Sequence, residues 1–525
     1  MKLYRAFATV GGLTLVSRVL GFLRDIAFAW AFGAGWVADA FNVAFRFPNL
    51  FRRLFGEGAF NSAFIPLFAK ELEGNGRDAA RAFAEEALAG LVAVLVALTV
   101  VAILAMPWLM YLLAPGFSAI PEKFDLAVLL TQITFPYLLC MSLVALFSGV
   151  LNTFGKFVES SSVSIVLNLT LLAAIFIGFW LGFRNEPGGG IVQAIGVFVA
   201  GVLQLWLLIS GLRRNNFTLK LRRPRMTDGM RRLISLGIPG VIAGGVTQLN
   251  IMIGTIIASQ QPGAVSQLYY ADRLYELPLA IVGIAIGVVL LPDVSRQLRA
   301  GNHAGVQDSQ NRSLEFAMLL TVPAAVALAV VPIPIVKVLF ERGAFTAADT
   351  ASTAAVLSVF ALGLPAFVMI KVFSPAYFAR EDTKTPMRYA VISLAANTAG
   401  SVVLFYLFRR LGYLPHLGIA VATALGGWLN AALLWVTLVR RGHFALDRRM
   451  ARAFGAILLS SVVMGLALVA AAHGLGSYLA ADRGFLVHVL ALAVLIGTGL
   501  AVYGAVVLAT GAISLRQLGK LVRRS

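Results

Sequence analysis

Long apolar runs, separated by short clusters of charged and turn-forming residues, follow one another along the whole chain. An α-helix needs about 20 apolar residues to cross the hydrocarbon core of a membrane, and most of these runs have that length or more. The runs predict about fourteen helices, at residues 7–32, 36–69, 82–114, 124–154, 158–183, 190–212, 230–258, 264–294, 313–340, 350–379, 386–408, 417–439, 452–473 and 485–510. The pattern therefore indicates an all-α integral membrane protein.

A weak internal repeat runs through the chain at a shift of about 229 residues. Pro136 in "ITFPYLL" matches Pro365 in "LGLPAFV", and Asn168 in "SIVLNLTLL" matches Asn397 in "SLAANTAGS". "LAPGF" (113–117) also matches "FERGAF" (340–345). The identities are few, so a chance match is the alternative. Because such a shift contains six helices, the two halves would be parallel repeats related by an axis along the membrane normal, as in many transporters.

The repeat predicts how the chain is divided. The expected parts are an N-lobe of six helices (1–212), a basic cytoplasmic linker (213–232), a C-lobe of six helices (233–440), helices thirteen and fourteen (450–510) and a basic cytoplasmic tail (511–525). The expected fold is thus two parallel-repeat six-helix lobes plus two C-terminal helices.

Composition supports the membrane assignment. Hydrophobic residues make up 59% of the chain and charged residues 13%, and the mean hydropathy is +0.86, which leaves no room for a large soluble domain. The formal net charge of +19 would suggest nucleic acid as a partner of a soluble protein. Here most Lys and Arg residues fall in alternate short loops, so we expect no nucleic-acid partner and place both termini in the cytoplasm. The first helix is expected to be retained, since Arg18 and Arg24 interrupt it and no cleavage site follows.

One predicted helix contains the stretch "ADAFNVAFRFPNLFRR" (38–53), in which polar residues interrupt an apolar run. The polar residues recur every three or four positions and are Asp39, Asn42, Arg46, Asn49 and Arg52. On a helix this spacing places them along one side. A polar partner or cavity is therefore expected to face that side.

Two further predicted helices have charges within their apolar runs. Helix one contains Arg18, Arg24 and Asp25, and helix eight contains Asp272, Arg273 and Glu276. Each charge in mid-membrane costs roughly 2.5 to 3.5 kcal/mol on insertion scales, so such a group needs a reason. In a two-lobed transporter, the polar faces of helices one, two and eight would meet at a central cavity.

Arginine dominates this group, and its planar guanidinium matches phosphate or carboxylate oxygens. An anionic substrate, such as a phosphate or pyrophosphate, is therefore expected. The candidate substrate-binding residues are Arg18, Arg24, Arg52 and Arg273, and the candidate supporting residues are Asp25, Asp39, Asn42, Arg46, Asn49, Asp272 and Glu276. The alternative is that these residues form structural ion pairs between helices or extend to the membrane interface.

Two prolines occupy matching places in the repeat. Pro48 and Pro278 each remove a helix hydrogen bond, which kinks or breaks the segment. Next to polar side chains this is typical of a hinge, and a simple kink in packed helices is the alternative.

The motifs of catalytic and metal sites are missing from the sequence. There is no HExxH, no GxSxG and no GK[ST] after the glycines at 56–58, and the five histidines lie in loops or near helix ends. Cys140 is the single cysteine, so no internal disulfide is possible, and its simplest interpretation is a small core residue. No enzyme activity, cofactor or metal site is expected.

Several long stretches together resemble the MurJ (MviN) lipid II flippase family. They are "SRVLGFLRD", "ADAFNVAFRFPNLFRRLFGEGAF", "YYADRLYELP", "LFERGAFTAADT" and "REDTKTP", and they occur in the family's order. The resemblance implies a member of the multidrug/oligosaccharidyl-lipid/polysaccharide exporter superfamily in the bacterial inner membrane.

The resemblance also implies roles for particular residues. The essential cavity arginines of the family correspond to Arg18, Arg24, Arg52 and Arg273, with Asp39 and Glu276 as supporting positions. Helices thirteen and fourteen would form a groove for the polyprenyl tail. Some members are thought to use a sodium site, but residues 386–408 contain Asn397 and no carboxylate, so no coupling ion is assigned.

The expected function is an alternating-access flippase whose arginines hold the pyrophosphate-sugar headgroup of lipid II. Expected partners are lipid II and membrane lipids, with cell-wall synthesis proteins as further candidates. Membrane potential, an ion gradient or product consumption could drive transport. The alternatives are a non-transporting scaffold for cell-wall enzymes and a cation-coupled drug exporter of the same superfamily, which would place unpaired acids rather than arginines in its cavity.

Overall fold

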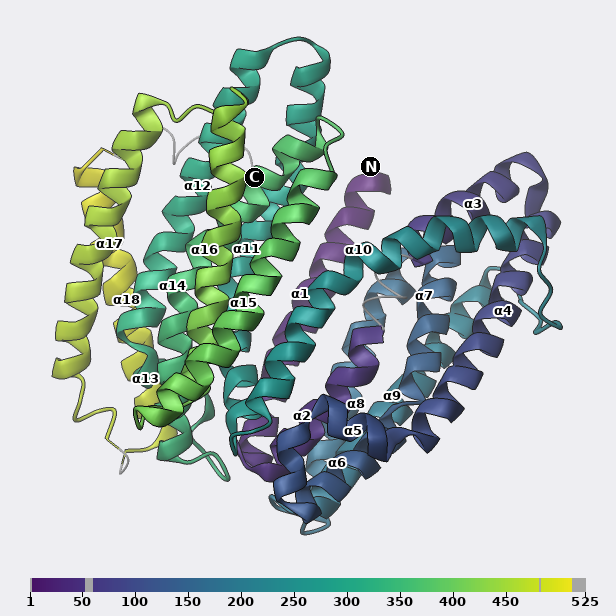
Figure 1. The fold of residues 1–525 in the computed structure, drawn as a ribbon, viewed down its shortest axis with the longest axis horizontal. Helices are drawn as coiled ribbons and strands as arrows, with labels where there is room; N and C mark the ends of the chain where they lie inside the picture. Colours follow the sequence, from purple (N-terminus) through teal and green to yellow (C-terminus); the bar gives the residue numbers. More distant parts are fainter. Residues whose placement is uncertain (1, 52–59, 481–482, 512–525) are drawn as a thin grey trace. The chain divides into compact units, whose positions relative to one another are not determined.

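The structure is a computed structural model that describes residues 2–51, 60–480 and 483–511, and Figure 1 shows its helices in chain order. Within these residues the regular elements are all helical. The chain forms two compact units. The first comprises Met1–Ser266 with Arg342–Phe345, and the second comprises Gln267–Glu341 with Thr346–Ser525. Lipid offers no partner for exposed N–H and C=O groups, so helices are the expected form for such apolar segments.

The first unit contains eleven of the described helices. They are α1 (Lys2–Phe32), α2 (Trp36–Phe51), α3 (Phe60–Gly74), α4 (Gly76–Leu104), α5 (Met106–Leu113), the short 3₁₀ helix η2 (Pro115–Ala119), α6 (Pro121–Thr134), α7 (Tyr137–Thr153), α8 (Phe157–Trp180), α9 (Pro187–Arg214) and α10 (Asp228–Ala258). Helix α8 packs between α1 and α9, and α6 and α7 pack on α9. Helix α10 packs on α3 and α4, so by its contacts it belongs to the first unit.

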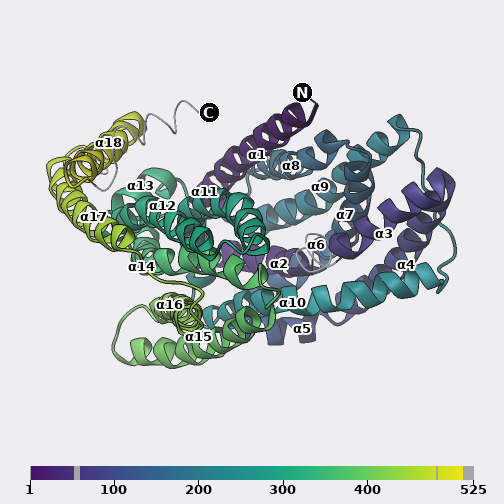
Figure 2. The same cartoon turned by 90° about the horizontal axis from the view of Figure 1, so that it is seen from above.

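The second unit contains the remaining described helices. They are α11 (Ala264–Arg299), whose first turn belongs to the first unit, α12 (His303–Val330), α13 (Pro332–Phe340), α14 (Ala347–Phe378), α15 (Lys384–Arg410), α16 (Leu417–Arg440), α17 (Arg448–Gly474) and α18 (Phe485–Ala509). Successive contacts place α18, α17, α12, α14, α16 and α15 in a row, and Figure 2 shows this order from above. Helices α17 and α18 therefore form one edge of this unit, next to α12.

Most helix boundaries agree with the apolar runs, but three expected helices are divided. A fourth, 36–69, is described only as α2 and α3, because residues 52–59 lie outside the described residues. The expected helix 82–114 divides at Ala105, 124–154 divides at Phe135 and Pro136, and 313–340 divides at Val331. Each break has a proline at it or just after it. These prolines are Pro107, Pro136 and Pro332. Proline cannot donate the helix hydrogen bond and clashes with the preceding turn, so each apolar run bends at that place.

The order of helices repeats along the chain. Helix α4, the short α5 and a loop precede α6, and in the same way α12, the short α13 and a loop precede α14. The corresponding helices α4 and α12 begin at Gly76 and His303, and α8 and α15 begin at Phe157 and Lys384. These starts agree with the sequence repeat of about 229 residues. The lobe boundaries at 212 and 233 stay a prediction.

Ten helices of the described residues are long and apolar enough to cross a membrane. The protein is therefore a multi-pass membrane protein, although the expected number of fourteen spans is not confirmed. Helices α1, α2, α10 and α11 are not among these ten.

The loop between α14 and α15 contains an ion pair that makes stability depend on pH. Arg441 Nη1 donates to Asp382 Oδ2 at 2.7 Å, and Thr385 donates to the same carboxylate through its backbone N–H and its hydroxyl. Partial burial alone would raise the pKa of Asp382. The hydrogen bonds from Arg441 and Thr385 have the larger, opposite effect, so the pKa is lowered to about 2. The carboxylate therefore stabilises the folded protein above about pH 4, and this stabilisation is lost as the pH falls towards 2.

We expect Asp382→Asn to lower the unfolding temperature in detergent at neutral pH by roughly 1 to 3 °C. The difference from the wild type should shrink between pH 4 and pH 2, since both proteins are then uncharged at this position. Glu381→Gln is the control, because it removes a neighbouring charge and none of these bonds. If the difference in unfolding temperature between Asp382→Asn and the wild type stayed constant down to pH 2, the lowered pKa of Asp382 would be contradicted.

Candidate functional site

The guanidinium of Arg24 is held in a fixed position between α1 and α8. Its Nε and Nη2 donate to Asp25 Oδ1 at 3.2 and 2.7 Å, and its Nη1 donates to Asn168 Oδ1 at 3.0 Å. Asn168 is itself oriented, because its Nδ2 donates to the Ser17 carbonyl at 2.9 Å. Asp25 and Asn168 are buried. The structure thus brings together two residues of the candidate site and adds Asn168, which the sequence had marked only through the repeat.

Asp39 lies at the centre of a second polar cluster in the first unit. Its carboxylate accepts hydrogen bonds from Lys123 Nζ at 2.7 Å, from the Gly263 N–H at 2.9 Å, and from the backbone N–H and hydroxyl of Ser266 at 2.9 and 2.8 Å. Asp39 is 0% exposed and Lys123 is 2% exposed. Because Gly263 and Ser266 begin α11, Asp39 acts as an N-terminal cap supplied by another helix. The Asp39 carboxylate is inaccessible to solvent in this structure.

Two other residues of the polar stripe on α2 contact the same region. Asn42 Nδ2 donates to Ser266 Oγ at 3.1 Å, and Arg46 Nη1 donates to Thr255 Oγ1 on α10 at 2.5 Å. Asn49 is half-buried farther along α2. The expected partner of the stripe is therefore, in this conformation, the end of α10 and the start of α11.

Two loops next to this cluster are packed so closely that only glycine fits. A β-carbon on Gly343 would lie 2.3 Å from the Trp30 carbonyl oxygen, and the Ala344 N–H donates to that oxygen at 2.9 Å. A β-carbon on Gly116 would lie 2.3 Å from the Ser259 carbonyl oxygen. Gly116 and Gly343 lie in the matching stretches "LAPGF" and "FERGAF". Gly343 packs against the end of α1, and Gly116 packs against the end of α10. The same contact thus occurs twice and closes this end of the first unit.

The second unit contains Arg273, one of the four candidate substrate-binding arginines. Arg273 Nη1 forms an ion pair with Glu276 Oε2 at 3.1 Å, one turn farther along α11, and its guanidinium lies 4.8 Å from the Tyr269 ring centre. Both side chains of the pair are partly exposed, and Asp272 is half-buried beside them. This part of α11 presents a charged surface that a polar ligand could reach.

Two lysines close to these charged residues were not among the predicted site residues. Lys123 lies between the expected helices 82–114 and 124–154, where a loop is predicted, yet it is buried against Asp39 and the Phe117 ring. Lys371 lies inside the apolar run of α14, where its Nζ would be 2.6 Å from a β-carbon on Gly283 of α11. A lysine within an apolar helix was the available signal for Lys371.

Other predicted residues have simpler positions. Arg18 is exposed on α1, Pro48 lies inside α2, and Pro278 lies inside α11. Arg52 lies outside the described residues, as does the tail beyond 511. The hinge role of the two prolines stays a prediction.

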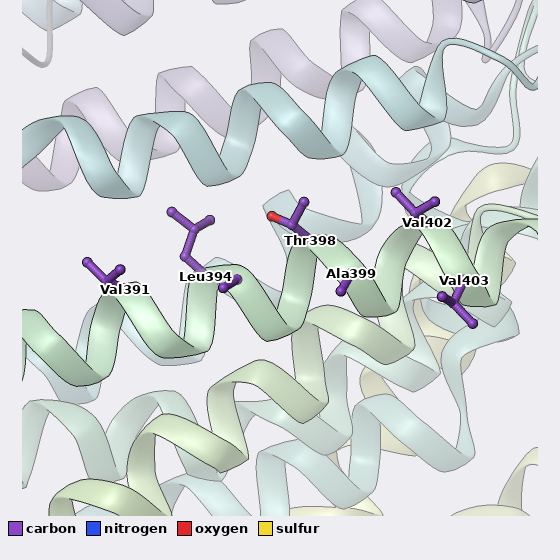
Figure 3. Close-up of a pocket in the computed structure, with 7 residues that line it drawn as sticks. Val391, Leu394, Thr398, Ala399, Val402 and Val403 are labelled. Carbon is purple, nitrogen blue, oxygen red and sulfur yellow. The ribbon is translucent and has the colours of Figure 1, made fainter.

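Two apolar hollows lie in the second unit. One, of about 580 Å³, follows a side of α15, where Val391, Leu394, Thr398 and Val402 are aligned as Figure 3 shows. The other, of about 260 Å³, lies between α12, α13, α17 and α18 and is lined by residues such as Pro323, Leu468 and Leu495. The described residues that line these two hollows include no charged side chain, so the hollows fit hydrocarbon rather than an anionic headgroup.

The fold and the site define a class of protein. Apolar helices form two units with a repeated helix order, and several charged residues are held within the helical bundle, as in multi-helix membrane transporters. A solved structure described as an inward-facing multidrug resistance MATE family transporter of the MOP superfamily shares this fold, with a TM-score of 0.65 at 15% identity over 81% of this chain and 95% of that one.

The chain belongs to the lipid II flippase MurJ family. The family model described as "Lipid II flippase MurJ" matches residues 28–497. The "Probable lipid II flippase MurJ" of Rhizobium tropici is 46% identical over 525 residues, which are 100% of this chain and 97% of that protein. The "Lipid II flippase MurJ" of Burkholderia cenocepacia is 36% identical over 450 residues, covering 85% of each chain. A solved structure described as "Lipid II flippase MurJ, inward closed conformation" matches with a TM-score of 0.78 at 26% identity, covering 95% of this chain and 97% of that one. The family resemblance seen in the sequence is confirmed, and this family is one of transporters rather than of enzymes.

Proposed function

We propose that the protein is a flippase that moves lipid II from the inner to the outer leaflet of the cytoplasmic membrane. The observation that supports this most strongly is the Arg24 site in a chain that belongs to the family along most of its length. Asp25 and Asn168 fix the guanidinium, so little ordering entropy is lost when an anion binds. Pyrophosphate oxygens match this planar group of donors.

The headgroup site also uses Arg18, Arg52 and Arg273 in this proposal. Arg273 contributes from the second unit, where Glu276 orients it. Rocking of the two lobes about the helices kinked by Pro48 and Pro278 exposes the headgroup to alternate sides. The closed end around Asp39, Gly116 and Gly343 is the part that must open for release.

The lipid tail stays in the hydrocarbon during this movement. The hollow between α12, α13, α17 and α18 is apolar and lies at the edge of the second unit, which suits a polyprenyl chain. Both termini lie in the cytoplasm in this proposal, because the basic loops alternate with loops that contain few positive charges. Cell-wall synthesis proteins are candidate partners.

Binding of lipid II to the purified full-length protein, measured by native mass spectrometry, tests the proposal. We expect Arg24→Ala with Arg273→Ala to weaken binding by about tenfold or more, since each charge-assisted hydrogen bond contributes about 1.5 to 3 kcal/mol. A neutral lipid should bind all variants equally. The matched control is Arg409→Ala with Arg410→Ala, which removes two exposed arginines at the end of α15.

The result also separates the alternatives. Selective loss of lipid II binding in a variant that accumulates normally in the membrane supports a transport site. Equal binding in the wild type and both double variants would contradict the arginine site and favour the scaffold function.

A further inference from the structure

The segment between α9 and α10 has no regular secondary structure, yet it is firmly attached to the first unit (Figure 1, teal, beside α4). Phe217 is fully buried, and its ring makes edge contacts with Phe154 at 5.0 Å and Phe68 at 5.9 Å. Arg77 Nη2 on α4 donates to the Asn215 carbonyl at 3.0 Å. The beginning of the segment is thus fixed by an aromatic side chain and by α4.

Two glutamates on α4 attach the rest of the segment. Glu85 is 1% exposed, and its carboxylate accepts the Lys220 N–H at 3.0 Å and pairs with Arg222 Nε at 2.5 Å. Glu86 Oε2 accepts the Thr227 hydroxyl at 2.7 Å. Because Thr227 also caps α10 through the Met230 N–H, the segment is tied at both ends.

The outer side of this segment combines positive charge with exposed apolar side chains. Residues 213–232, which are this segment with the adjoining ends of α9 and α10, contain eight Lys or Arg residues and one acidic residue, Asp228. The apolar Leu221 and Met226 are 65% and 61% exposed, and between them Arg223 and Arg225 are exposed as well. Water is a poor environment for Leu and Met, so a fixed loop that displays them among arginines indicates a surface that they enter.

The position of the segment identifies that surface. Helix α9 is a candidate membrane span whose last turn contains Arg213 and Arg214, so the chain leaves the hydrocarbon at the start of the segment. Trp206, two turns earlier, is exposed, and tryptophan is enriched at membrane interfaces. The segment therefore begins at the level of the lipid headgroups.

We propose that residues 213–232 form a docking surface for anionic phospholipid headgroups of the membrane leaflet beside them. The arginines contact lipid phosphates, and Leu221 and Met226 insert among the acyl chains. This surface lies outside the proposed transport site, and the inference does not depend on lipid II transport. Its consequence is that the connection between the two halves is anchored to the membrane surface and responds to lipid charge.

A fluorescent probe at position 226 of the full-length protein tests the proposal. Met226→Cys is labelled with an environment-sensitive dye, and the native Cys140 gives little background because it is buried. The protein is placed in nanodiscs of brominated lipids with either 30% or no phosphatidylglycerol, the remainder being phosphatidylcholine. We expect strong quenching with the anionic lipid and weak quenching without it, and the anionic effect should decrease at high salt.

Variants assign the effect to the charges. Arg223→Gln with Arg225→Gln should reduce the anion-dependent association about fivefold for each arginine. Arg222 is left in place because it pairs with Glu85, so the segment stays attached. Arg409→Gln with Arg410→Gln, which removes the same charge elsewhere, should leave quenching unchanged.

Three results would overturn the proposal. They are equal quenching in the two lipid compositions, no quenching in either, and equal loss in the two double variants. Protection of the dye by a soluble acidic protein without quenching by lipid would instead assign the surface to a soluble partner.

Discussion

Replacing Asp39 with alanine is expected to destabilise the first unit by about 3 to 5 kcal/mol. The change leaves the Lys123 ammonium buried without its carboxylate partner, and burying an unpaired charge is far more costly than losing an exposed ion pair. It also removes the acceptor for the Gly263 and Ser266 N–H groups at the start of α11. The cost thus comes from one carboxylate that binds three residues, Lys123 of α6 and Gly263 and Ser266 at the start of α11.

Thermal unfolding of purified protein in detergent measures this effect, and a double-mutant cycle with Lys123→Met assigns it. The double variant should be clearly more stable than Asp39→Ala alone, because the unpaired ammonium is gone. Asp78→Ala is the control, since Asp78 pairs with Arg81 at 3.2 Å but is 96% exposed, and it should change stability by less than about 1 kcal/mol. If Asp39→Ala and Asp78→Ala had similar effects, the buried pair would not be a main support of this region.

Replacing Gly343 with alanine is expected to force the 342–345 loop away from the turn between α1 and α2. The backbone φ of Gly343 is +59°, where an L side chain is strained, and the new β-carbon would lie 2.3 Å from the Trp30 carbonyl oxygen. Backbone strain and overpacking together cost about 2 to 5 kcal/mol. Since the opposing atom belongs to the backbone, the loop itself must move.

Gly412→Ala is the matched control, because Gly412 has a φ of +76° but open space around its β-carbon position. It should show the conformational cost of about 1 kcal/mol without the clash. Gly116→Ala tests the other loop, where the clash occurs without a positive φ. Labelling of a cysteine at the buried Ala34 by a membrane-impermeant maleimide should become faster in Gly343→Ala and stay slow in Gly412→Ala. Unchanged labelling in Gly343→Ala would show that the loop does not close this end.

The sequence was informative about features that depend on local pattern. Apolar run lengths located most helices, because membrane insertion requires a similar apolar length of each. Helix α12 begins at His303, well before the expected start at 313, because its first turns are polar. The repeat marked Asn168 and Asn397 as equivalent, and both are buried in the structure. Asn168 proved to be the residue that orients Arg24.

Features that depend on distant contacts could not be predicted in the same way. Lys123 follows a proline at the start of a helix and has the sequence context of a loop charge, and nothing local shows that Asp39 will bury it. The breaks at Ala105 and Val331 were missed because run length joins two helices that a nearby proline separates. The glycine contacts likewise appear only when two loops meet.

The segment Arg342–Phe345 has a consequence for how the protein is made. It belongs to the first unit, while the chain on both sides of it, from Gln267 to Glu341 and from Thr346 onward, belongs to the second. A ribosome that has synthesised residues 1–266 has therefore not yet supplied the loop that packs on Trp30 and Gly33. During biosynthesis the first unit must wait, with this face uncovered, until α11, α12 and α13 have entered the membrane, so the two halves mature together rather than in sequence.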